Sequence, residues 1–277
     1  MNICVFGDGV MGNIVRQMLL EGEDCVVEPA FSAAGPVSEP AEVRSTTCEP
    51  ATAGKEVRST TCEPAAAGKE PGVEEPGPAA AKPEGMIDFS YPGNIQNIYE
   101  SARKLYEEGT AVPVVIATTG YNDEQMAIIE KIAEFSPVML SSNFSYGINC
   151  MAELVEHAMA MTGEDTDVEI IEKHHNRKTD VPSGTALMLA KLTGRAILCG
   201  RSTPGRRGRE VGVHSVRGGN IFGEHTVIFA MDDEVIEIKH TAYSRRIFAK
   251  GAIEAVHWLE GKPAGMYNVL DCLTGLC

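Results

Sequence analysis

The sequence predicts an α/β protein in two parts: an N-terminal Rossmann-like dinucleotide-binding domain with a parallel sheet, and a second α+β domain with a mixed or antiparallel sheet. Strand-like and helix-like segments alternate over residues 2–27 and 86–140, which is typical of a parallel sheet with helices on both faces. Several strand-like segments then follow one another between residues 168 and 240, which indicates a mixed sheet. With 277 residues, 43% of them hydrophobic, the chain is long enough for one or two domains.

The first strand–helix unit carries a glycine motif. An apolar strand is expected at 2–6 and a helix at 13–21, and between them lies Gly7-Asp8-Gly9-Val10-Met11-Gly12. Gly7 allows a tight turn, Gly9 lets the backbone approach a pyrophosphate, and Gly12 lets the helix pack close to the strand. Glycine turns are common, but this one follows a strand and opens a helix, and that context indicates a dinucleotide site.

A low-complexity insert interrupts the pattern at about residues 31–85. It is rich in Pro, Ala, Gly and Glu, and residues 42–55 recur with one change at 56–69. Two copies are too few for a solenoid. The segment has few large apolar residues to offset the entropy lost on ordering, so we expect a disordered excursion, with a partner-binding loop as the alternative.

Beyond the insert the alternation resumes, with strands at 86–89, 112–117 and 137–140 and helices at 92–108 and 123–135. Polar turns follow two of these strands, at the edge where parallel sheets bind ligands. They are ordinary turn formers as well as candidates for a cofactor site, and they comprise Ala117-Thr118-Thr119 and Ser141-Ser142-Asn143-Phe144.

The later elements predict the second domain and a final helix. We expect helices at 148–161 and 247–259 and strands at 168–171, 210–216, 225–230 and 235–240.

The run from Glu172 to Ala186 holds the candidate catalytic residues. It offers two adjacent imidazoles, His174 and His175, and the ammonium group of Lys178, in a loop expected to leave a strand and enter a helix. Ser183 is a good helix N-cap, and the free N–H groups of the helix start favour a carboxylate or phosphate. Each residue also has a structural interpretation, because most histidines are not catalysts and most lysines are surface charges. A His-His pair could bind a metal, but no Cys or carboxylate lies beside it at a zinc spacing, so no metal is expected.

Composition narrows the class of protein. The net charge of −15 argues against nucleic acid and anionic membranes as partners, and no apolar run approaches the length of a membrane span. The first strand begins at once, so no signal peptide is expected. The eight cysteines form no C-x-x-C pair, which favours a reduced, cytoplasmic setting.

These motifs together resemble the 4-hydroxy-tetrahydrodipicolinate reductase (dihydrodipicolinate reductase) family. The resemblance covers residues 1–30 and 86–277. Besides the glycine motif and the His-His-Lys-Pro-Ser-Gly-Thr run, the matching pieces are Ile87-Asp88-Phe89-Ser90, Ala117–Gly120, Ser142–Gly147, Gly208–Gly212, Ser215–Gly219 and Gly223–Thr226. The order Glu-x-His-His-x-x-Lys-x-Asp-x-Pro-Ser-Gly-Thr is specific to this family.

The resemblance implies NAD(P)H-dependent reduction of 4-hydroxy-tetrahydrodipicolinate to tetrahydrodipicolinate in lysine and diaminopimelate biosynthesis. It implies that His174 is the proton donor or acceptor and that Lys178 is the second catalytic residue. It places the small dicarboxylate substrate against His175, Ser183, Gly184 and Thr185, and the nicotinamide end of the cofactor between the 117–119 and 141–144 turns. It also implies a homotetramer, with the dinucleotide-binding domain at 1–142 and 245–277 and the substrate-binding and oligomerisation domain at 143–244.

The cofactor preference rests on one residue. Glu28 lies about where an acidic group binds a ribose hydroxyl, and no Arg or Lys follows until Arg44, so of NADH and NADPH we expect NADH to be preferred. Two alternatives stay open. One is another two-domain Rossmann dehydrogenase that acts on an amino acid or sugar, and the other is a non-catalytic nucleotide-binding sensor.

Overall fold

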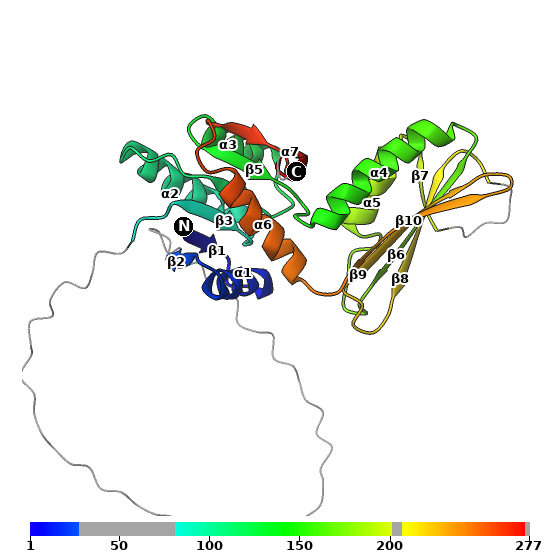
Figure 1. Ribbon diagram of the computed structural model, residues 1–277, viewed down its shortest axis with the longest axis horizontal. Helices are drawn as coiled ribbons and strands as arrows, with labels where there is room; N and C mark the ends of the chain where they lie inside the picture. The colour runs from blue at the N-terminus through cyan, green and yellow to red at the C-terminus, as the bar shows by residue number, and fades with distance from the viewer. Residues whose placement is uncertain (28–80, 201–206, 275–277) are drawn as a thin grey trace, which may run out of the picture. The chain divides into compact units, whose positions relative to one another are not determined.

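Two β-sheets organise the chain (Figure 1). A computed structural model describes residues 1–27, 81–200 and 207–274. Glu28 and almost all of the predicted insert lie outside the described residues.

The first sheet has six parallel strands in the order β11-β5-β4-β3-β1-β2. Its strands are β1 (Asn2–Phe6), β2 (Cys25–Val27), β3 (Gly85–Asp88), β4 (Val114–Ile116), β5 (Pro137–Leu140) and β11 (Gly265–Tyr267). Its helices are α1 (Val10–Glu21), α2 (Ile95–Glu107, after a 3-10 turn at Pro92–Asn94), α3 (Asp123–Ala133), α6 (Arg246–Trp258) and α7 (Val269–Thr274). Because β1 pairs with β2 on one side and β3 on the other, the strand order reverses beside the glycine motif, where open α/β sheets bind their ligands.

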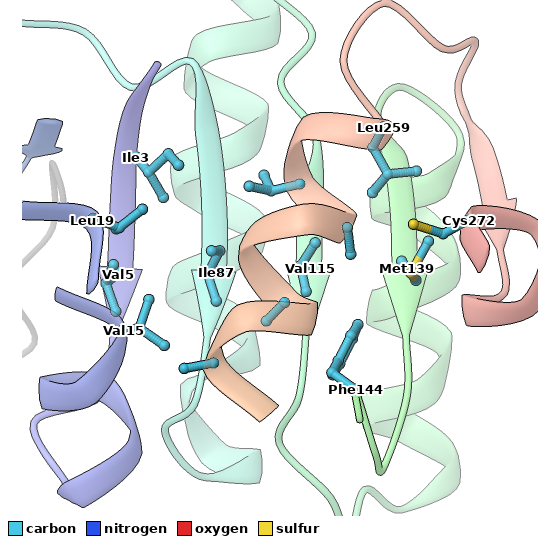
Figure 2. Packing of buried hydrophobic residues seen from close by; sticks show 14 of the residues in the cluster. Ile3, Val5, Val15, Leu19, Ile87, Val115, Met139, Phe144, Leu259 and Cys272 are labelled. Atoms are coloured by element: carbon cyan, nitrogen blue, oxygen red, sulfur yellow. The ribbon is translucent and has the colours of Figure 1, made fainter. Parts of the chain in front are cut away.

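Strand residues of this sheet are buried on alternate faces. Ile3 and Val5 point toward α1 and α6, and Cys4 and Phe6 point toward α2 and α3. Figure 2 shows the first of these layers, with Ile87 and further side chains of the strands facing α6. Burial on both faces explains why the strands are apolar without alternation, as expected for a parallel sheet.

The second sheet has five strands in the order β10-β9-β6-β8-β7. They are β6 (Asp167–His174), β7 (Ile197–Cys199), β8 (Val211–Arg217), β9 (Gly223–Ala230) and β10 (Val235–Ala242). Because β6 runs parallel to β8 and antiparallel to β9, this sheet is mixed. The predicted fold class, a Rossmann-like parallel sheet plus a second mixed sheet, is confirmed.

Two helices cover one face of the second sheet. They are α4 (Tyr146–Thr162) and α5 (Gly184–Leu192), and they bury Val155 and Leu189 against Ile170, Val213 and Phe229. Most of these buried side chains are fully excluded from solvent. This packing fixes α5 beside β6, and therefore fixes the two ends of the loop that carries the candidate catalytic residues.

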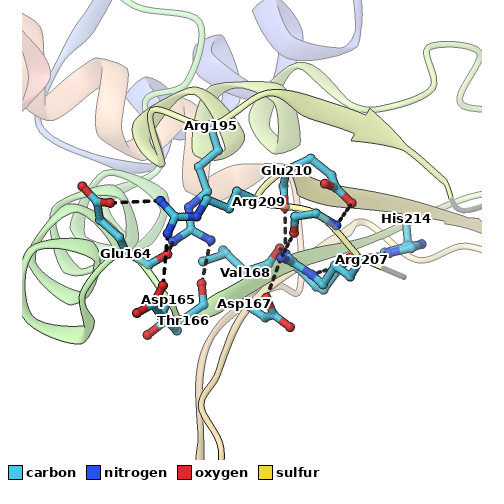
Figure 3. A network of polar contacts seen from close by, with 12 residues as sticks. Glu164, Asp165, Thr166, Asp167, Val168, Arg195, Arg207, Arg209, Glu210 and His214 are labelled. Atoms are coloured by element: carbon cyan, nitrogen blue, oxygen red, sulfur yellow. Dashed lines mark hydrogen bonds and ion pairs between the residues drawn. The ribbon is translucent and has the colours of Figure 1, made fainter. Parts of the chain in front are cut away.

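Arginines tie the start of β6 to the chain that precedes β7 and to the chain that precedes β8 (Figure 3). Arg207 donates to Asp167 Oδ1 at 2.6 Å, Glu169 Oε1 at 3.1 Å and the Val168 carbonyl at 2.7 Å, and its side chain is only 17% exposed. Arg195 donates to the Thr166 and Glu164 carbonyls. These bonds hold the end of the sheet that lies away from the loop with the candidate catalytic residues.

Several predicted boundaries were wrong. Strand β6 runs on to His174, so Glu172 and His174 lie in the strand and not in the loop, because their backbone pairs with Ser215 and Arg217 of β8. Helix α1 begins at Val10, three residues before the predicted start. Strands β7 and β11 and helix α7 were not predicted; they are short, with three, three and six residues. Within the described residues, no helix combines the length and apolar character needed to span a membrane.

Candidate functional site

The glycine motif forms a tight turn between β1 and α1. Gly7 has φ +105°, and a Cβ on it would lie 2.5 Å from the Phe89 carbonyl oxygen. A Cβ on Gly12 would lie 1.9 Å from the Gly7 carbonyl oxygen. Any side chain at either position would therefore collide with backbone, and Gly7 also needs a φ that other residues avoid.

Gly9 differs from the other two glycines because the space beside it is open. It is the N-cap of α1, no atom lies within 4 Å of its ideal Cβ position, and no side chain caps the helix. The exposed N–H groups and the helix dipole at this point suit a pyrophosphate. Asp8, Val10 and Met11 complete the motif, and both Asp8 and Val10 are exposed. The residues present therefore fit a dinucleotide.

Arg16 was missed by the sequence reasoning. Its guanidinium donates to the carbonyl oxygens of Gly7 at 2.8 Å and Val5 at 2.9 Å and to Asp8 Oδ1 at 3.1 Å. These bonds satisfy carbonyls at the end of β1 and partly neutralise the Asp8 carboxylate, which would otherwise repel a pyrophosphate. Its position one turn beyond Gly12 is the only signal that the sequence gives.

The other candidate cofactor residues line the same edge of the sheet. The N–H groups of Phe89, Ala117 and Ser141 donate in turn to Phe6, Asp88 and Ile116 of the neighbouring strands. Thr118 is buried, whereas Thr119 and Ser142 are exposed. The Phe144 side chain is only 2% exposed because it packs in the core, so Phe144 can offer a cofactor no more than its backbone.

Asp88 anchors these loops. It is 1% exposed and accepts hydrogen bonds from Ser90 N at 2.9 Å and Tyr121 Oη at 3.2 Å. Burial raises the pKa of Asp88, although these bonds oppose the rise.

A direct hydrogen bond joins the candidate cofactor residues to the candidate substrate residues. Asn143 Nδ2 donates to Thr185 Oγ1 at 3.1 Å, and the loop of Asn143 is held by bonds to Ser141 Oγ and from Ser145 N. The sequence predicts both residues as ligand contacts but gives no sign that they touch.

His174 is the last residue of β6, and His175 and Lys178 follow it in the loop. Burial lowers the pKa of His174, and the charges of Lys178 and Arg217 lower it further, against the opposing effect of Glu172. Burial, followed by the charges of Arg177 and Arg245, lowers the pKa of His175. Lys178 forms an ion pair with Asp180 at 2.8 Å, and its side chain is 22% exposed.

The start of α5 provides the second half of this site. Ser183 is the N-cap predicted from the sequence, and its hydroxyl accepts from Ala186 N at 3.1 Å. Nothing lies within 4 Å of the ideal Cβ position of Gly184, so a ligand can reach the first turn of the helix. Thr185 is half-buried and faces Asn143.

Three further residues surround His174, and the sequence reasoning assigned them no role. Glu172 Oε2 accepts from His174 Nδ1 at 2.6 Å, Arg217 contacts both carboxylate oxygens, and the His225 ring lies edge-on to His174 at 5.2 Å. The Ser183 hydroxyl is 3.1 Å from His225 Nε2. Burial would raise the pKa of Glu172, but the Arg217 and His174 bonds hold it at about 2. Burial lowers the pKa of His225 to about 3.

No metal site emerges from the part of the chain that the structure describes: it contains no group of three or more His, Cys, Asp or Glu side chains arranged to hold an ion.

Comparison with known proteins gives one consistent result. Residues 1–144 match the family model for the N-terminus of dihydrodipicolinate reductase, and residues 147–273 match the model for its C-terminus. The 4-hydroxy-tetrahydrodipicolinate reductase of Clostridium tetani is 43% identical over 197 residues, which cover 68% of this chain and 74% of that protein. The reductase of Caldanaerobacter subterraneus is 44% identical over 194 residues, which cover 67% and 75%.

A solved structure has the same fold. It is the dipicolinate-bound dihydrodipicolinate reductase from Paenisporosarcina sp. TG-14, which superimposes with a TM-score of 0.62 at 20% identity over 97% of each chain.

Proposed function

The chain belongs to the dihydrodipicolinate reductase family, and we propose that it reduces 4-hydroxy-tetrahydrodipicolinate to tetrahydrodipicolinate, with loss of water. It is an oxidoreductase of lysine and diaminopimelate biosynthesis that uses a nicotinamide dinucleotide. Neither another dehydrogenase reaction nor a sensor role is favoured by any of the comparisons.

The observation that carries this proposal is the hydrogen bond from Asn143 to Thr185. Asn143 belongs to the turn expected beside the nicotinamide, and Thr185 belongs to the helix start expected to hold the substrate. Hydride transfer requires cofactor and substrate to be in contact, because the reacting atoms must lie within about 3–3.5 Å. A hydrogen bond between the two candidate ligand sites supports this proposal, because it shows that the two loops adjoin.

The chain's residues would bind the substrate through its two carboxylates. We assign them to the N–H groups at the start of α5, to His175, and to Ser183, Gly184 and Thr185. The open space at Gly184 and the half-buried position of His175 support this assignment. A dicarboxylate beside His174 would also raise its pKa, because a nearby negative charge favours the imidazolium.

A nicotinamide cofactor, when bound, would supply the hydride that reduces a ring carbon conjugated with an imine of the substrate. The chain then has to supply a proton, because the resulting enamine is protonated at the neighbouring carbon. We assign His174 as the proton donor and acceptor, and Lys178 as the second catalytic residue, which stabilises negative charge and helps to protonate the ring or its leaving hydroxyl. The electrostatic coupling between Lys178 and His174 supports their action at one site.

Lys178→Ala tests the catalytic assignment. We expect kcat to fall on the order of 10²-fold or more, with the fold intact. Loss of NADH absorbance should be followed with freshly generated substrate, because the assay then reports this reaction and no other. The matched control is Lys191→Ala, an exposed lysine at the end of α5 that should retain wild-type turnover. Near-normal turnover by Lys178→Ala would remove this lysine from the mechanism.

For the cofactor, we propose the glycine motif, Ala117, Thr118, Thr119, Ser141, Ser142, Asn143 and the Phe144 backbone as contacts. We also propose a preference for NADH over NADPH, with Glu28 on the adenosine ribose. The ratio of kcat/KM for the two cofactors tests the preference, and Glu28→Ala should reduce the ratio if Glu28 causes it.

We further propose a homotetramer built through the second sheet, with residues 143–244 as the substrate-binding and oligomerisation domain and residues 1–142 and 245–277 as the dinucleotide-binding domain. The sheet face opposite α4 and α5 carries Ile171, Val216 and Ile228, which are half-buried or exposed. Light scattering should give the mass of four chains, and Ile228→Lys should reduce it. A control, Leu154→Lys on the exposed side of α4, should not. The cytoplasmic location expected from the cysteines stays a prediction.

A further inference from the structure

The carboxylate of Glu172 is fully buried, and its oxygens accept four hydrogen bonds. Oε2 accepts from His174 Nδ1 at 2.6 Å and from Arg217 Nη1 at 2.8 Å. Oε1 accepts from Arg217 Nη2 at 2.7 Å and from Ser183 N at 3.2 Å. A carboxylate has about four acceptor sites, so each is used. One side chain therefore holds the candidate catalytic imidazole, an arginine of β8 and the N-cap of α5.

We propose that Glu172 is a positioning residue that holds the proton of neutral His174 on Nδ1, so that Nε2 is the ring atom which exchanges a proton with the substrate. This inference rests on the proposed function for the identity of the reaction, but the state of the imidazole can be tested apart from it.

The geometry leaves one choice of tautomer. An ionised carboxylate is an acceptor only, so the nitrogen 2.6 Å from it has to carry the proton. The bidentate contact with Arg217 keeps the carboxylate ionised. The other nitrogen, Nε2, faces Gly223, where a Cβ would come within 3.2 Å of it. The glycine at that position leaves room beside the reactive nitrogen.

The same network reaches Lys178. Arg217 Nη2 also donates to the Asp180 carbonyl at 2.7 Å, and the Asp180 carboxylate forms the ion pair with Lys178. Because Glu172 also binds the Ser183 N–H, it is linked to both ends of the loop between β6 and α5. Removal of its charge should therefore disturb proton transfer more than cofactor binding.

The test is Glu172→Gln in the full-length protein, with Glu169→Gln as its matched control. Glu169 lies three residues earlier in β6 and also contacts a histidine and an arginine, His214 at 2.7 Å and Arg207 at 3.1 Å. We expect Glu172→Gln to lower kcat on the order of 10²-fold or more and to move the kcat–pH profile toward acid, because Glu172 raises the pKa of His174. Glu169→Gln should stay within about twofold of wild type. Cofactor affinity should not change in either variant.

The second readout is ¹⁵N NMR of the histidine side chains, assigned with a His174→Gln variant. Wild-type His174 should show a protonated Nδ1 and an unprotonated Nε2, and Glu172→Gln should shift it toward a mixture of tautomers. If Glu172→Gln does not fold, Glu172→Gln/Arg217→Gln removes both charges and should show the same two effects.

Three results would overturn the inference. These are a wild-type His174 protonated on Nε2, a turnover within about threefold of wild type after loss of Glu172, and a loss of turnover with the tautomer unchanged. A wild-type protein that is inactive on the substrate but has the expected tautomer would refute the proposed function and not the positioning by Glu172.

Discussion

The buried histidine His225 should make the stability of this protein fall in mild acid. It is 4% exposed, burial lowers its pKa to about 3, and its ordinary value is 6.5. Within the described residues its Nδ1 is buried with no hydrogen-bond partner, so the imidazolium would bury a donor that has no acceptor. The folded state should therefore keep His225 neutral at pH values where the unfolded chain protonates it.

The sign and size of the change in the free energy of unfolding follow from the difference between the folded and unfolded pKa of His225. The unfolded state binds the extra proton below pH 6.5, so stability is highest above this pH and is lost as the pH falls toward about 3. Each pH unit in this window costs about 1.4 kcal/mol, so the loss between pH 7 and pH 5 from this one site is about 2 kcal/mol. Glu172, whose pKa is about 2, changes the stability with pH only below its ordinary pKa of 4.5, so it does not contribute to the loss between pH 7 and pH 5.

The assay is urea unfolding of wild type and His225→Gln at pH 7 and pH 5. Gln can keep a hydrogen bond to the Ser183 hydroxyl but does not titrate, so the variant should lose about 2 kcal/mol less than wild type between the two pH values. Histidines that do not interact with His225 contribute equally to both proteins and cancel. The control is His157→Gln, an exposed residue of α4, which should follow wild type. If His225→Gln and wild type lose the same free energy, His225 is not the neutral buried group described here.

Three further predictions test the glycine motif, the second sheet and the space beside His174. Gly12→Ala should destabilise the fold, because its Cβ would lie 1.9 Å from a carbonyl oxygen. Gly9→Ala should change the free energy of unfolding by about 1 kcal/mol or less. The Gly9 variant should nevertheless weaken NADH binding, measured by fluorescence titration. Arg207→Met should lower the free energy of unfolding by about 2–3 kcal/mol, because it removes the contacts of Arg207 with the start of β6. Arg209→Met should lower it by less than about 0.5 kcal/mol, because the Arg209 side chain is 73% exposed. Equal losses would show that the Arg207 contacts do not stabilise the start of β6. Gly223→Ala should reduce kcat about tenfold with cofactor affinity unchanged, because its Cβ would lie 3.2 Å from Nε2 of His174, the proposed proton donor and acceptor. Unchanged turnover would show that this space is not needed.

Features that depend on near neighbours in the chain could be predicted from the sequence. Ser183 caps α5 because a serine hydroxyl reaches the N–H three residues on, whatever the rest of the fold does. The glycine motif is similar in part, because the φ of +105° at Gly7 and the contact of Gly12 with the Gly7 carbonyl both arise within one turn of six residues. Short strands could not be predicted in the same way. β7 and β11 have three residues each, and the partner strand decides whether such a segment joins a sheet.

Contacts across the sheet explain most of what was missed at the site. Arg217 reaches Glu172 because β6 and β8 pair in a register that sets Glu172 opposite Ser215, and no local pattern encodes a register between residues 45 positions apart. The bond from Asn143 to Thr185 likewise joins residues 42 apart. Glu172 and Arg217 both lie in segments that resemble the family, but the resemblance does not show that these two side chains contact each other.

Glu172 itself could have been found with a stricter use of the alternation rule. Val168, Ile170, Glu172 and His174 follow one another at every second position, and all four are buried. The prediction ended the strand at Ile171 because the apolar residues stop there, but the period of two does not depend on polarity. Continued through the polar residues, it sets Glu172 and His174 on the face that buries Ile170. A carboxylate and an imidazole two positions apart on a buried strand face have to pair with each other or with another charge, because a buried charge is costly without a partner. A strand that stays in period while its inward residues turn polar is therefore a signal for a buried polar pair, and the amino-acid sequence alone is enough to detect it.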